Sequence, residues 1–133
     1  MNEVRVSQKG AGRVSSGHLW IFSSDVADRD GAQPGQPVKV ADPRGRPLGT
    51  AHYSSTSQIC LRMLSRQVED IGRDFFLRRL RAAEEHRRTV VRHTDAYRVV
   101  HGEADLLPAL VVTATAITSS CRPSIRAWTL PRA

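Results

Sequence analysis

The sequence has few cysteines, few lysines and few aromatic residues, and it has no long hydrophobic run. Its two cysteines, Cys60 and Cys121, are isolated, so they make neither a disulfide framework nor a C-x-x-C metal site. We expect Cys60 to be a small core residue on a strand. No stretch approaches the roughly 18 apolar residues of a membrane span, and no charged-then-apolar leader opens the chain. These absences predict a soluble, cytoplasmic protein.

Length and charge narrow the class further. The 133 residues, 40% of them hydrophobic, can support one small globular domain with an appendage, which excludes a large catalytic fold. The net charge of +7 comes mainly from arginine, since Lys9 and Lys39 are the only lysines among 20 basic residues. Arginine outside a core favours contacts with phosphates and base edges. The excess is modest in the patterned part of the chain, because three arginines lie in the tail after residue 112.

Short apolar runs separated by turn residues dominate the first 65 residues. Their alternation predicts about four or five strands, a spacing typical of a small β-barrel. The clearest strand segments are residues 4–6, 37–41, 48–53 and 58–64. The glycines of residues 10–12 interrupt the pattern before a short segment compatible with a helical turn, residues 13–17. Residues 20–22 form a compact apolar anchor that we expect to be buried, and residues 42–45 have Pro and Gly where a tight turn needs them.

The period of the pattern changes after residue 67. From residue 68 to about residue 92 the apolar side chains fall at helical intervals, which predicts a long amphipathic helix. Its apolar positions are Ile71, Phe75, Phe76, Leu80 and Ala83, and the arginines around them are Arg73, Arg78, Arg79, Arg81, Arg87 and Arg88. Residues 96–100 and 107–112 then predict two strands, joined by residues 101–105, that open a second β unit.

The segment KGAGRVSSG imitates a glycine-rich dinucleotide-binding turn, and Asp28 or Asp30 follows near the distance of a ribose-binding acid. Gly17 comes two residues too late for the G-x-G-x-x-G pattern, and no crossover helix follows, so we reject this interpretation. Two alternatives stay open. The segment is either a simple turn or a loop that brings backbone amides, Lys9 and Arg13 close to a nucleic-acid phosphate.

The histidines and acids indicate no catalytic or metal site. His101, Glu103 and Asp105 alternate, so a strand would present all three on one face, but no other ligand spacing supports a metal. We favour a solvated hairpin with acidic residues at its turn. The other histidines, His18, His52, His86 and His93, are scattered, and no nucleophile–base pair can be nominated.

A few aromatic side chains are candidates for stacking on bases, which is a usual means of RNA binding. For Trp20 and Phe22 we favour a core position, because a small barrel with few aromatics needs them inside. Tyr53 and His18 are more open candidates. The Arg-rich face of the helix is expected to be a solvated surface, with RNA contact or docking of a protein partner as the alternatives.

Four ordered motifs carry a resemblance to a known family. They are KGAGRVSSGHLWIFSSDV, VKVADPRGRPLGTAHYSSTSQICLRMLS, FFLRRLRAAEEHRR and AYRVVHGEADLLPALVV, and together they cover residues 4–112 almost continuously. This pattern resembles the bacterial class I S-adenosylmethionine-dependent rRNA large-subunit methyltransferases, which carry an N-terminal PUA domain and act on cytosine carbon-5. The departures are small. Leu19 stands where the family usually has Pro, and Leu106 and Ala109 stand where it usually has Gly, which weakens the turn before Leu110.

The resemblance implies an α+β fold: a small PUA-like β pseudobarrel that docks RNA, followed by a long amphipathic helix and an incomplete β-hairpin. The expected divisions are residues 1–67 for the RNA-binding domain, 68–92 for the linker helix, 93–112 for the start of a truncated central domain, and 113–133 for an irregular tail. The residues assigned to RNA binding, with rRNA as the implied partner, are Lys9, Arg13, His18, Tyr53 and Arg62.

The same resemblance implies that the catalytic chemistry lies elsewhere. In the family a C-terminal Rossmann-like domain holds S-adenosylmethionine and the catalytic cysteine. No residue of this chain is therefore assigned a catalytic, cofactor-binding or metal-binding role, and methyl transfer by the chain alone is not expected.

The tail from Thr113 onward has no apolar period. In relatives the strand after Leu-Val-Val continues approximately Asp-Arg-Tyr-Gly-Asp, and this pattern reappears when the codons implied by the tail are shifted by one base. We therefore hypothesise a frameshift at about Val112 to Thr113. A naturally short protein with a disordered basic tail is the competing explanation.

Overall fold

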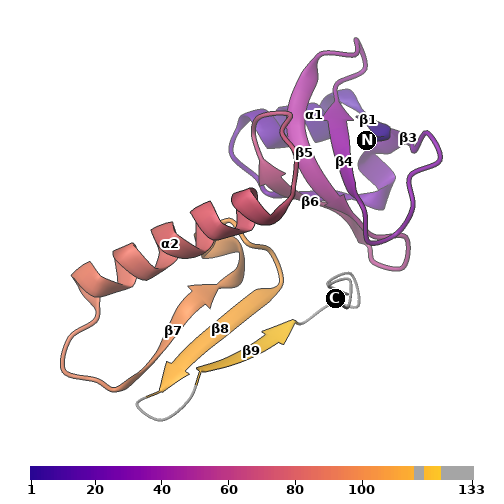
Figure 1. Cartoon of the computed structure of the whole chain (residues 1–133). Coiled ribbons are helices and arrows are strands. Elements are labelled where there is room, and N and C mark those ends of the chain that lie inside the picture. The colour runs from indigo at the N-terminus through magenta and orange to yellow at the C-terminus, as the bar shows by residue number, and fades with distance from the viewer. Residues whose placement is uncertain (116–118, 124–133) are drawn as a thin grey trace. The chain divides into compact units, whose positions relative to one another are not determined.

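The computed structural model describes residues 1–115 and 119–123. The chain forms two compact units that divide between Glu69 and Asp70, called unit 1 and unit 2 below. Figure 1 shows unit 1 from indigo to magenta and unit 2 in the warmer colours. Within the described ranges, no helix has both the length and the apolar character that crossing a membrane requires.

Unit 1 is a curled six-stranded sheet with one short helix (Figure 1). The strand order is β2-β6-β5-β4-β1-β3, and neighbouring strands are antiparallel except for the parallel pair β1 and β4. The elements are β1 (Glu3–Val6), α1 (Gln8–Ser15), β2 (Trp20–Phe22), η1 (Ser23–Asp25), β3 (Val26–Asp28), β4 (Pro37–Ala41), β5 (Pro47–Tyr53) and β6 (Ile59–Ser65). The predicted small pseudobarrel is confirmed, and β3 is a strand that the sequence pattern did not predict.

The core of unit 1 follows the alternation of its strands. Val4, Val38, Val40 and Leu61 are at most 1% exposed, and Cys60 is buried as expected. Because successive side chains of a strand point to opposite faces, each strand buries one face against this cluster and turns the other outward. The sheet therefore offers an outer surface whose residues are set by strand register.

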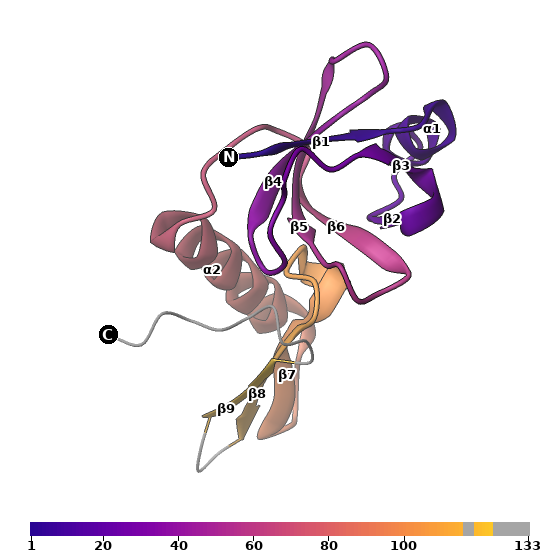
Figure 2. The ribbon, with the colours of Figure 1, turned by 90° about the vertical axis from the view of Figure 1, so that its right-hand side faces the viewer.

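Helix α1 begins earlier than the sequence predicted, at Gln8 instead of residue 13. The hydroxyl of Ser7 caps it by accepting a hydrogen bond from the Gly10 amide at 3.2 Å. Gly10 lies inside this helix. A Cβ at this position would be only 3.2 Å from the Cβ atoms of both Asp25 and Val6, so glycine lets the helix pack closely against them. Gly10 thus allows the helix to approach β1 and η1, and the segment is not a loop. Figure 2 shows α1 leaving the end of β1.

The glycine-rich segment is also not a dinucleotide-binding turn. Helix α1 connects β1 to β2, which lie apart in the sheet with β6, β5 and β4 between them. A dinucleotide site requires a crossover between parallel strands of a βαβ unit. The topology supports the rejection of that interpretation.

The turn between β4 and β5 matches the prediction. The Gly45 amide donates to the carbonyl of Asp42 at 3.0 Å, and Gly45 has a φ of 78°. The buried Asp42 carboxylate accepts from the amides of Arg44 and Arg46 at 2.8 and 2.9 Å and from Arg46 Nε at 2.7 Å. Burial by itself raises the pKa of Asp42, but the hydrogen bonds from Arg46 and Arg44 outweigh burial and hold that pKa below its usual value.

Gly49 is required by the packing of β5 against the end of β6. It has a φ of 141°, and a Cβ at this position would fall 2.1 Å from the carbonyl oxygen of Ser65. The hydroxyl of Thr50, the next residue, donates to the Gln67 carbonyl at 3.0 Å and accepts from the Glu69 amide at 3.2 Å. The segment that leaves β6 is therefore folded back onto β5.

Unit 2 contains one long helix and a three-stranded antiparallel sheet of order β7-β8-β9. Its elements are α2 (Arg73–Val90), β7 (Ala96–His101), η2 (Gly102–Asp105), β8 (Leu110–Thr115) and β9 (Ser119–Pro123). The amphipathic helix and the hairpin β7–β8 are confirmed. Helix α2 begins at Arg73, later than the predicted residue 68, and β8 begins at Leu110 because residues 107–109 form a turn closed by the Leu110 amide and the Leu107 carbonyl at 3.1 Å.

Regular structure does not stop at Val112. Strand β8 continues through Thr115, and β9 pairs with it from Ala114 opposite Ser119 to Leu110 opposite Pro123. The expectation of an irregular chain from Thr113 onward is wrong for these residues, since backbone pairing needs no apolar period. Residues 116–118 and 124–133 of the predicted tail lie outside the described part of the chain.

The turn before β8 contains two side chains in left-handed backbone. Leu106 has a φ of 57° and Ala109 a φ of 65°. These are the two positions where the family resemblance leads us to expect glycine. For residues with a Cβ this conformation costs roughly 1–2 kcal/mol, so the predicted weakening of the turn has a structural basis.

Candidate nucleic-acid interface

The five residues predicted to bind RNA all belong to unit 1, but they do not form one cluster. Lys9 and Arg13 lie one turn apart on α1, and His18 follows that helix. Arg62 is on β6 and Tyr53 on β5. The structure brings Lys9 and Arg13 together, gives Arg62 different neighbours, and places Tyr53 in the core.

Lys9 and Arg13 lie next to the buried carboxylate of Asp25. Lys9 Nζ is 3.9 Å from one Asp25 oxygen, and Arg13 Nε is 3.8 Å from the other. The Arg13 guanidinium also lies over the ring of the half-buried Phe22, 5.1 Å from its centroid, which is a cation–π contact. Arg13 therefore holds α1 to η1 and β2. The Lys9 side chain, 71% exposed, keeps most of its surface in solvent.

Three residues of neighbouring strands form a row on the outer face of the sheet, the β2–β6–β5 row: Trp20, Arg62 and His52. Arg62 stands opposite Trp20 of β2 on one side and opposite His52 of β5 on the other. Directly opposed residues of antiparallel strands point to the same face, with Cβ atoms roughly 5 Å apart. An aromatic side chain, a guanidinium and an imidazole are thus adjacent on this face.

Trp20 contradicts its predicted position in the core, because the residue is 43% exposed. In the short strand β2 the neighbouring Ile21 is the inward residue and is fully buried. All three residues of β2 are apolar, so alternation alone does not say which face is inward, and the scarcity of aromatics favoured the opposite assignment. Sequence reasoning therefore missed Trp20 as a surface aromatic and gave no role to His52.

Tyr53 corrects the prediction in the other direction. It is 4% exposed and belongs to the core cluster, opposite the buried Leu61 of β6. Tyr53 and Ala51 share the inward face of β5, whereas His52 points outward. A buried side chain cannot stack on a base, so Tyr53 is not a contact residue of this surface.

Burial and the charge of Arg62 both act on the imidazole of His52 in this row. Burial lowers the pKa of His52, and the nearby Arg62 guanidinium lowers it further. The imidazole is therefore neutral at pH 7, and Arg62 carries the positive charge. Arg62 Nη1 donates to the Ile59 carbonyl at 3.2 Å, which orients a guanidinium that has further N–H donors.

The acidic cluster predicted at residues 101–105 is structural. The Asp105 carboxylate accepts from Arg87 Nη2 and from the His101 amide, both at 2.6 Å, and the Arg87 and Asp105 side chains are 13% and 7% exposed. Asp105 is therefore a buried anchor between α2 and the end of β7, and the expected solvated turn is wrong for this residue. Over residues 1–115 and 119–123 no group of three or more His, Cys, Asp or Glu side chains could hold a metal ion.

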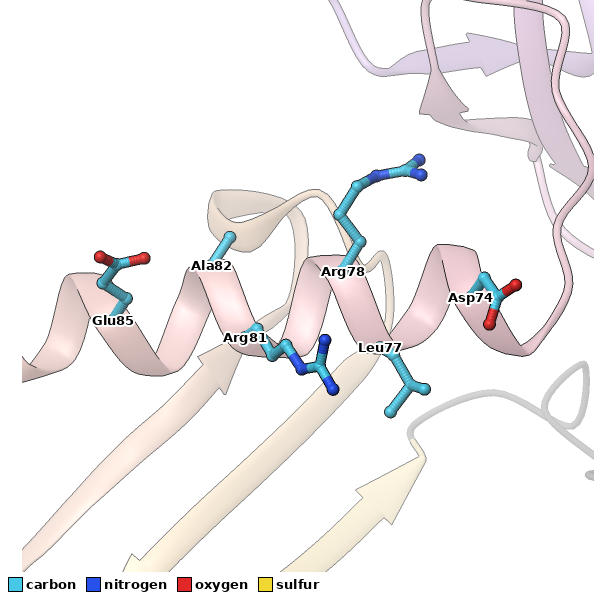
Figure 3. Close-up of a pocket in the computed structure, with 6 residues that line it drawn as sticks. All are labelled: Asp74, Leu77, Arg78, Arg81, Ala82 and Glu85. Carbon is cyan, nitrogen blue, oxygen red and sulfur yellow. The ribbon is translucent and has the colours of Figure 1, made fainter.

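Helix α2 has a charged outer surface with a shallow hollow of about 490 Å³. The residues that line it are Asp74, Leu77, Arg78, Arg81, Ala82 and Glu85. Figure 3 shows these side chains along α2, with Leu77 and Arg78 leaving the helix in different directions. Both acids and arginines line the hollow, so it offers no single sign of charge to a ligand.

The comparisons with known proteins agree with this architecture. Residues 4–66 match the PUA-like domain family. The ribosomal RNA large subunit methyltransferase I of Erwinia tasmaniensis is 42% identical over 99 aligned positions, and the match covers 71% of this chain and 25% of the relative. The protein of the same name from Tolumonas auensis is 38% identical over the same shares of the two chains. The chain spans about a quarter of the length of the curated relatives it matches.

Two solved structures share the fold. A protein described as a SAM-dependent methyltransferase from Streptococcus mutans superposes with a TM-score of 0.72 at 17% identity, covering 86% of this chain and 30% of that one. A second chain, described as a methyltransferase complexed with SAH, has a TM-score of 0.73 with the same identity and coverage. The resemblance inferred from the four sequence motifs is confirmed, and so is the α+β fold class.

Proposed function

Because residues 4–66 of the chain belong to the PUA-like domain family and its curated relatives are rRNA methyltransferases, we propose that unit 1 binds RNA. The partner is ribosomal RNA, encountered in the cytoplasm. The observation that carries the proposal is that unit 1 presents cations from two of its elements. Lys9 of α1 has a side chain that is 71% exposed, and the half-buried Arg62 lies on the outer face of β6, opposite Trp20. His18, which follows α1, is exposed as well.

The contribution of each predicted residue follows from its surroundings. Lys9 is a mobile, solvated cation suited to a phosphate. Arg62 has a fixed orientation and free donors, which suits a phosphate or a base edge. Arg13 acts mainly by positioning, since Asp25 and Phe22 already hold its guanidinium.

Salt-dependent RNA binding is the direct test of this proposal. A fragment of large-subunit rRNA titrated with the full chain should bind with an affinity that falls linearly on a logarithmic salt scale, because phosphate contacts release counterions. Lys9→Ala and Arg62→Ala should each lower the slope by about one. Arg44→Ala is the matched control, since it removes an exposed arginine from the turn between β4 and β5. Affinity independent of salt, or equal losses in all three variants, would refute the proposal.

We further propose that the chain corresponds to the RNA-binding front part of a methyltransferase whose catalytic part it does not contain. The coverage of a quarter of each curated relative supports this. Incubation of the chain with rRNA and isotopically labelled S-adenosylmethionine should transfer no methyl group. Methyl transfer by the chain alone would contradict the proposal.

The frameshift near Val112 belongs to the same proposal. Strand β8 runs on from Val112 to Thr115, while its side chains change from apolar to small and polar, which supports a change of reading frame within a strand. Nucleotide sequence across this junction should show a family-like reading frame shifted by one base. Its absence would refute the frameshift.

A second candidate function uses the outer surface of α2. Arg73, Arg78 and Arg81 are exposed on this helix, and the hollow beside them contains acids as well. Such a mixed surface suits docking of a protein partner more than binding of RNA. Gel filtration of the chain with and without rRNA separates the two functions. If RNA binding depends on unit 1, the Arg78→Ala and Arg81→Ala variants should still elute with rRNA, whereas RNA binding by α2 would be lost in them.

A further inference from the structure

The exposed Trp20 is the most unusual surface residue of unit 1. Large aromatic side chains are normally buried in a small domain, since each removes a large apolar area from water. Here the buried anchor of strand β2 is Ile21, and the indole lies on the outer face with 43% of the residue exposed. Burial in the core of unit 1 therefore does not account for the choice of tryptophan.

The surroundings of Trp20 are cationic and contain no carboxylate within the row. Arg62 stands directly opposite on β6, and His52 stands opposite Arg62 on β5. The row ends with Pro37 of β4, which is opposite His52. A partner that covers this row must therefore offer a flat apolar face beside negative charge.

Nucleic acid has that combination of chemistry. Each base has a π-face and each nucleotide a phosphate, and aromatic side chains beside arginine bind unpaired bases in this way. A base inside a duplex already has both faces stacked and is not available to a side chain on a flat sheet. The row thus distinguishes unpaired from paired RNA.

We propose that Trp20 stacks on an unpaired base of the bound RNA while Arg62 contacts the neighbouring phosphate. This inference rests on the proposed RNA binding of unit 1 and adds the class of nucleotide that the surface takes. His52, opposite Arg62 on β5, borders the same phosphate position.

The test uses the fluorescence of Trp20 itself. The sequence has two tryptophans, so Trp128→Phe in the full chain leaves Trp20 as the only one. This variant is titrated with a single-stranded RNA of about 10 nucleotides and with a blunt RNA duplex of the same length, and a label on the RNA reports occupancy independently. Stacking should quench Trp20 emission with the single strand, and at equal occupancy the duplex should leave it unchanged.

Substitutions sharpen the same experiment. Trp20→Ala should weaken binding of the single strand roughly 10-fold without changing the salt slope, because base stacking carries no counterion release. Trp20→Phe keeps an aromatic ring and should lose less than about threefold. Arg62→Ala should instead lower the salt slope by about one.

The outcomes separate this inference from the function on which it rests. Salt-dependent binding of the single strand without quenching, or with unchanged affinity in Trp20→Ala, overturns the stacking role and leaves RNA binding intact. Equal quenching by single strand and duplex overturns the preference for unpaired bases. The absence of any RNA binding overturns both proposals.

Discussion

Units 1 and 2 satisfy the conformational demands of their turns in different ways. In unit 1 left-handed backbone is occupied by glycine at residues 17, 31, 35, 45 and 49, and by Asp30, a residue type that tolerates this conformation. In unit 2 the turn before β8 puts Leu106 and Ala109 in left-handed backbone. Unit 2 thus places two apolar side chains where unit 1 has glycine or aspartate, and its turn stores strain.

The two units also differ in how they are held together. Unit 1 has a continuous apolar core drawn from α1 and most of its strands. In unit 2 the helix α2 buries only Phe75 and Ala83, and a buried ion pair between Arg87 and Asp105 joins the helix to the sheet. Unit 1 therefore depends on one continuous core, and unit 2 combines a smaller group of buried residues, among them Val100, Leu107 and Leu110, with the polar contacts of Arg87.

The largest loss of stability is expected from Gly49→Ala, which removes a glycine from left-handed backbone in unit 1. The new Cβ would fall 2.1 Å from the Ser65 carbonyl oxygen, and that backbone atom can move only if β5 and β6 separate. We expect a loss of roughly 4 kcal/mol in the free energy of unfolding. Gly45→Ala is the control, since its φ of 78° is also left-handed but no atom lies within 4 Å. Urea unfolding should show a loss of about 1 kcal/mol for the control, and equal losses would contradict the steric explanation.

Removal of the buried ion pair should break unit 2. Arg87→Ala leaves the Asp105 carboxylate buried and uncompensated, which costs roughly 3 kcal/mol. Amide hydrogen exchange should show lost protection in β7 and β8 while protection in β4 and β5 persists. Arg88→Ala is the matched control one residue along, because its pair with Glu84 is exposed and worth less than about 1 kcal/mol. Uniform loss of protection in both units would show that they do not unfold separately.

Glycine at the strained positions of unit 2 should make its turn resemble those of unit 1 and stabilise it. Leu106→Gly or Ala109→Gly removes a Cβ from left-handed backbone, and we expect each to stabilise unit 2 by up to about 1 kcal/mol. The converse change, Gly102→Ala at a φ of 57°, should destabilise by a similar amount. Local hydrogen exchange in β7 measures both. Destabilisation by both glycine variants would mean that the lost side-chain packing outweighs the strain.

Low pH should destabilise unit 1 through the buried carboxylate of Asp42 in the turn between β4 and β5. We expect this to be the smallest of the four effects on stability. The pKa of Asp42 is lower in the folded than in the unfolded chain, so the folded state binds this proton less readily. Its stabilising contribution is present above the unfolded pKa of about 3.9 and is lost as pH falls through the folded pKa. Asp42→Asn should make the stability of unit 1 fall less steeply as pH decreases. Urea unfolding midpoints measured between about pH 5 and pH 2 test this. If the variant lost stability with falling pH as steeply as the original chain, other carboxylates would be responsible for the acid sensitivity.

Local patterns in the sequence were sufficient for much of the fold. Alternating side chains predicted β4 with the bounds Pro37–Ala41, and Pro and Gly predicted the turn after it. Helical spacing predicted α2, apart from its first residues. These features depend on interactions within a few residues, so the chemistry that forms them is visible in the order of side chains.

The site depended on information that is not local. Trp20 and Tyr53 exchanged their expected places, because alternation separates the two faces of a strand but only the assembled sheet decides which face is inside. The row of Trp20, Arg62 and His52 comes from three strands whose register was not predictable from their separate patterns.

The sequence by itself determined the family, the order of the elements and the positions where the turn before β8 prefers glycine, since each is carried by contiguous motifs. The tertiary structure decided that Gly10 belongs to a helix, that Asp105 is a buried partner of Arg87, and that Trp20 faces solvent. Each of these depends on contacts between residues far apart in the chain, whose energies arise only when the strands and helices pack.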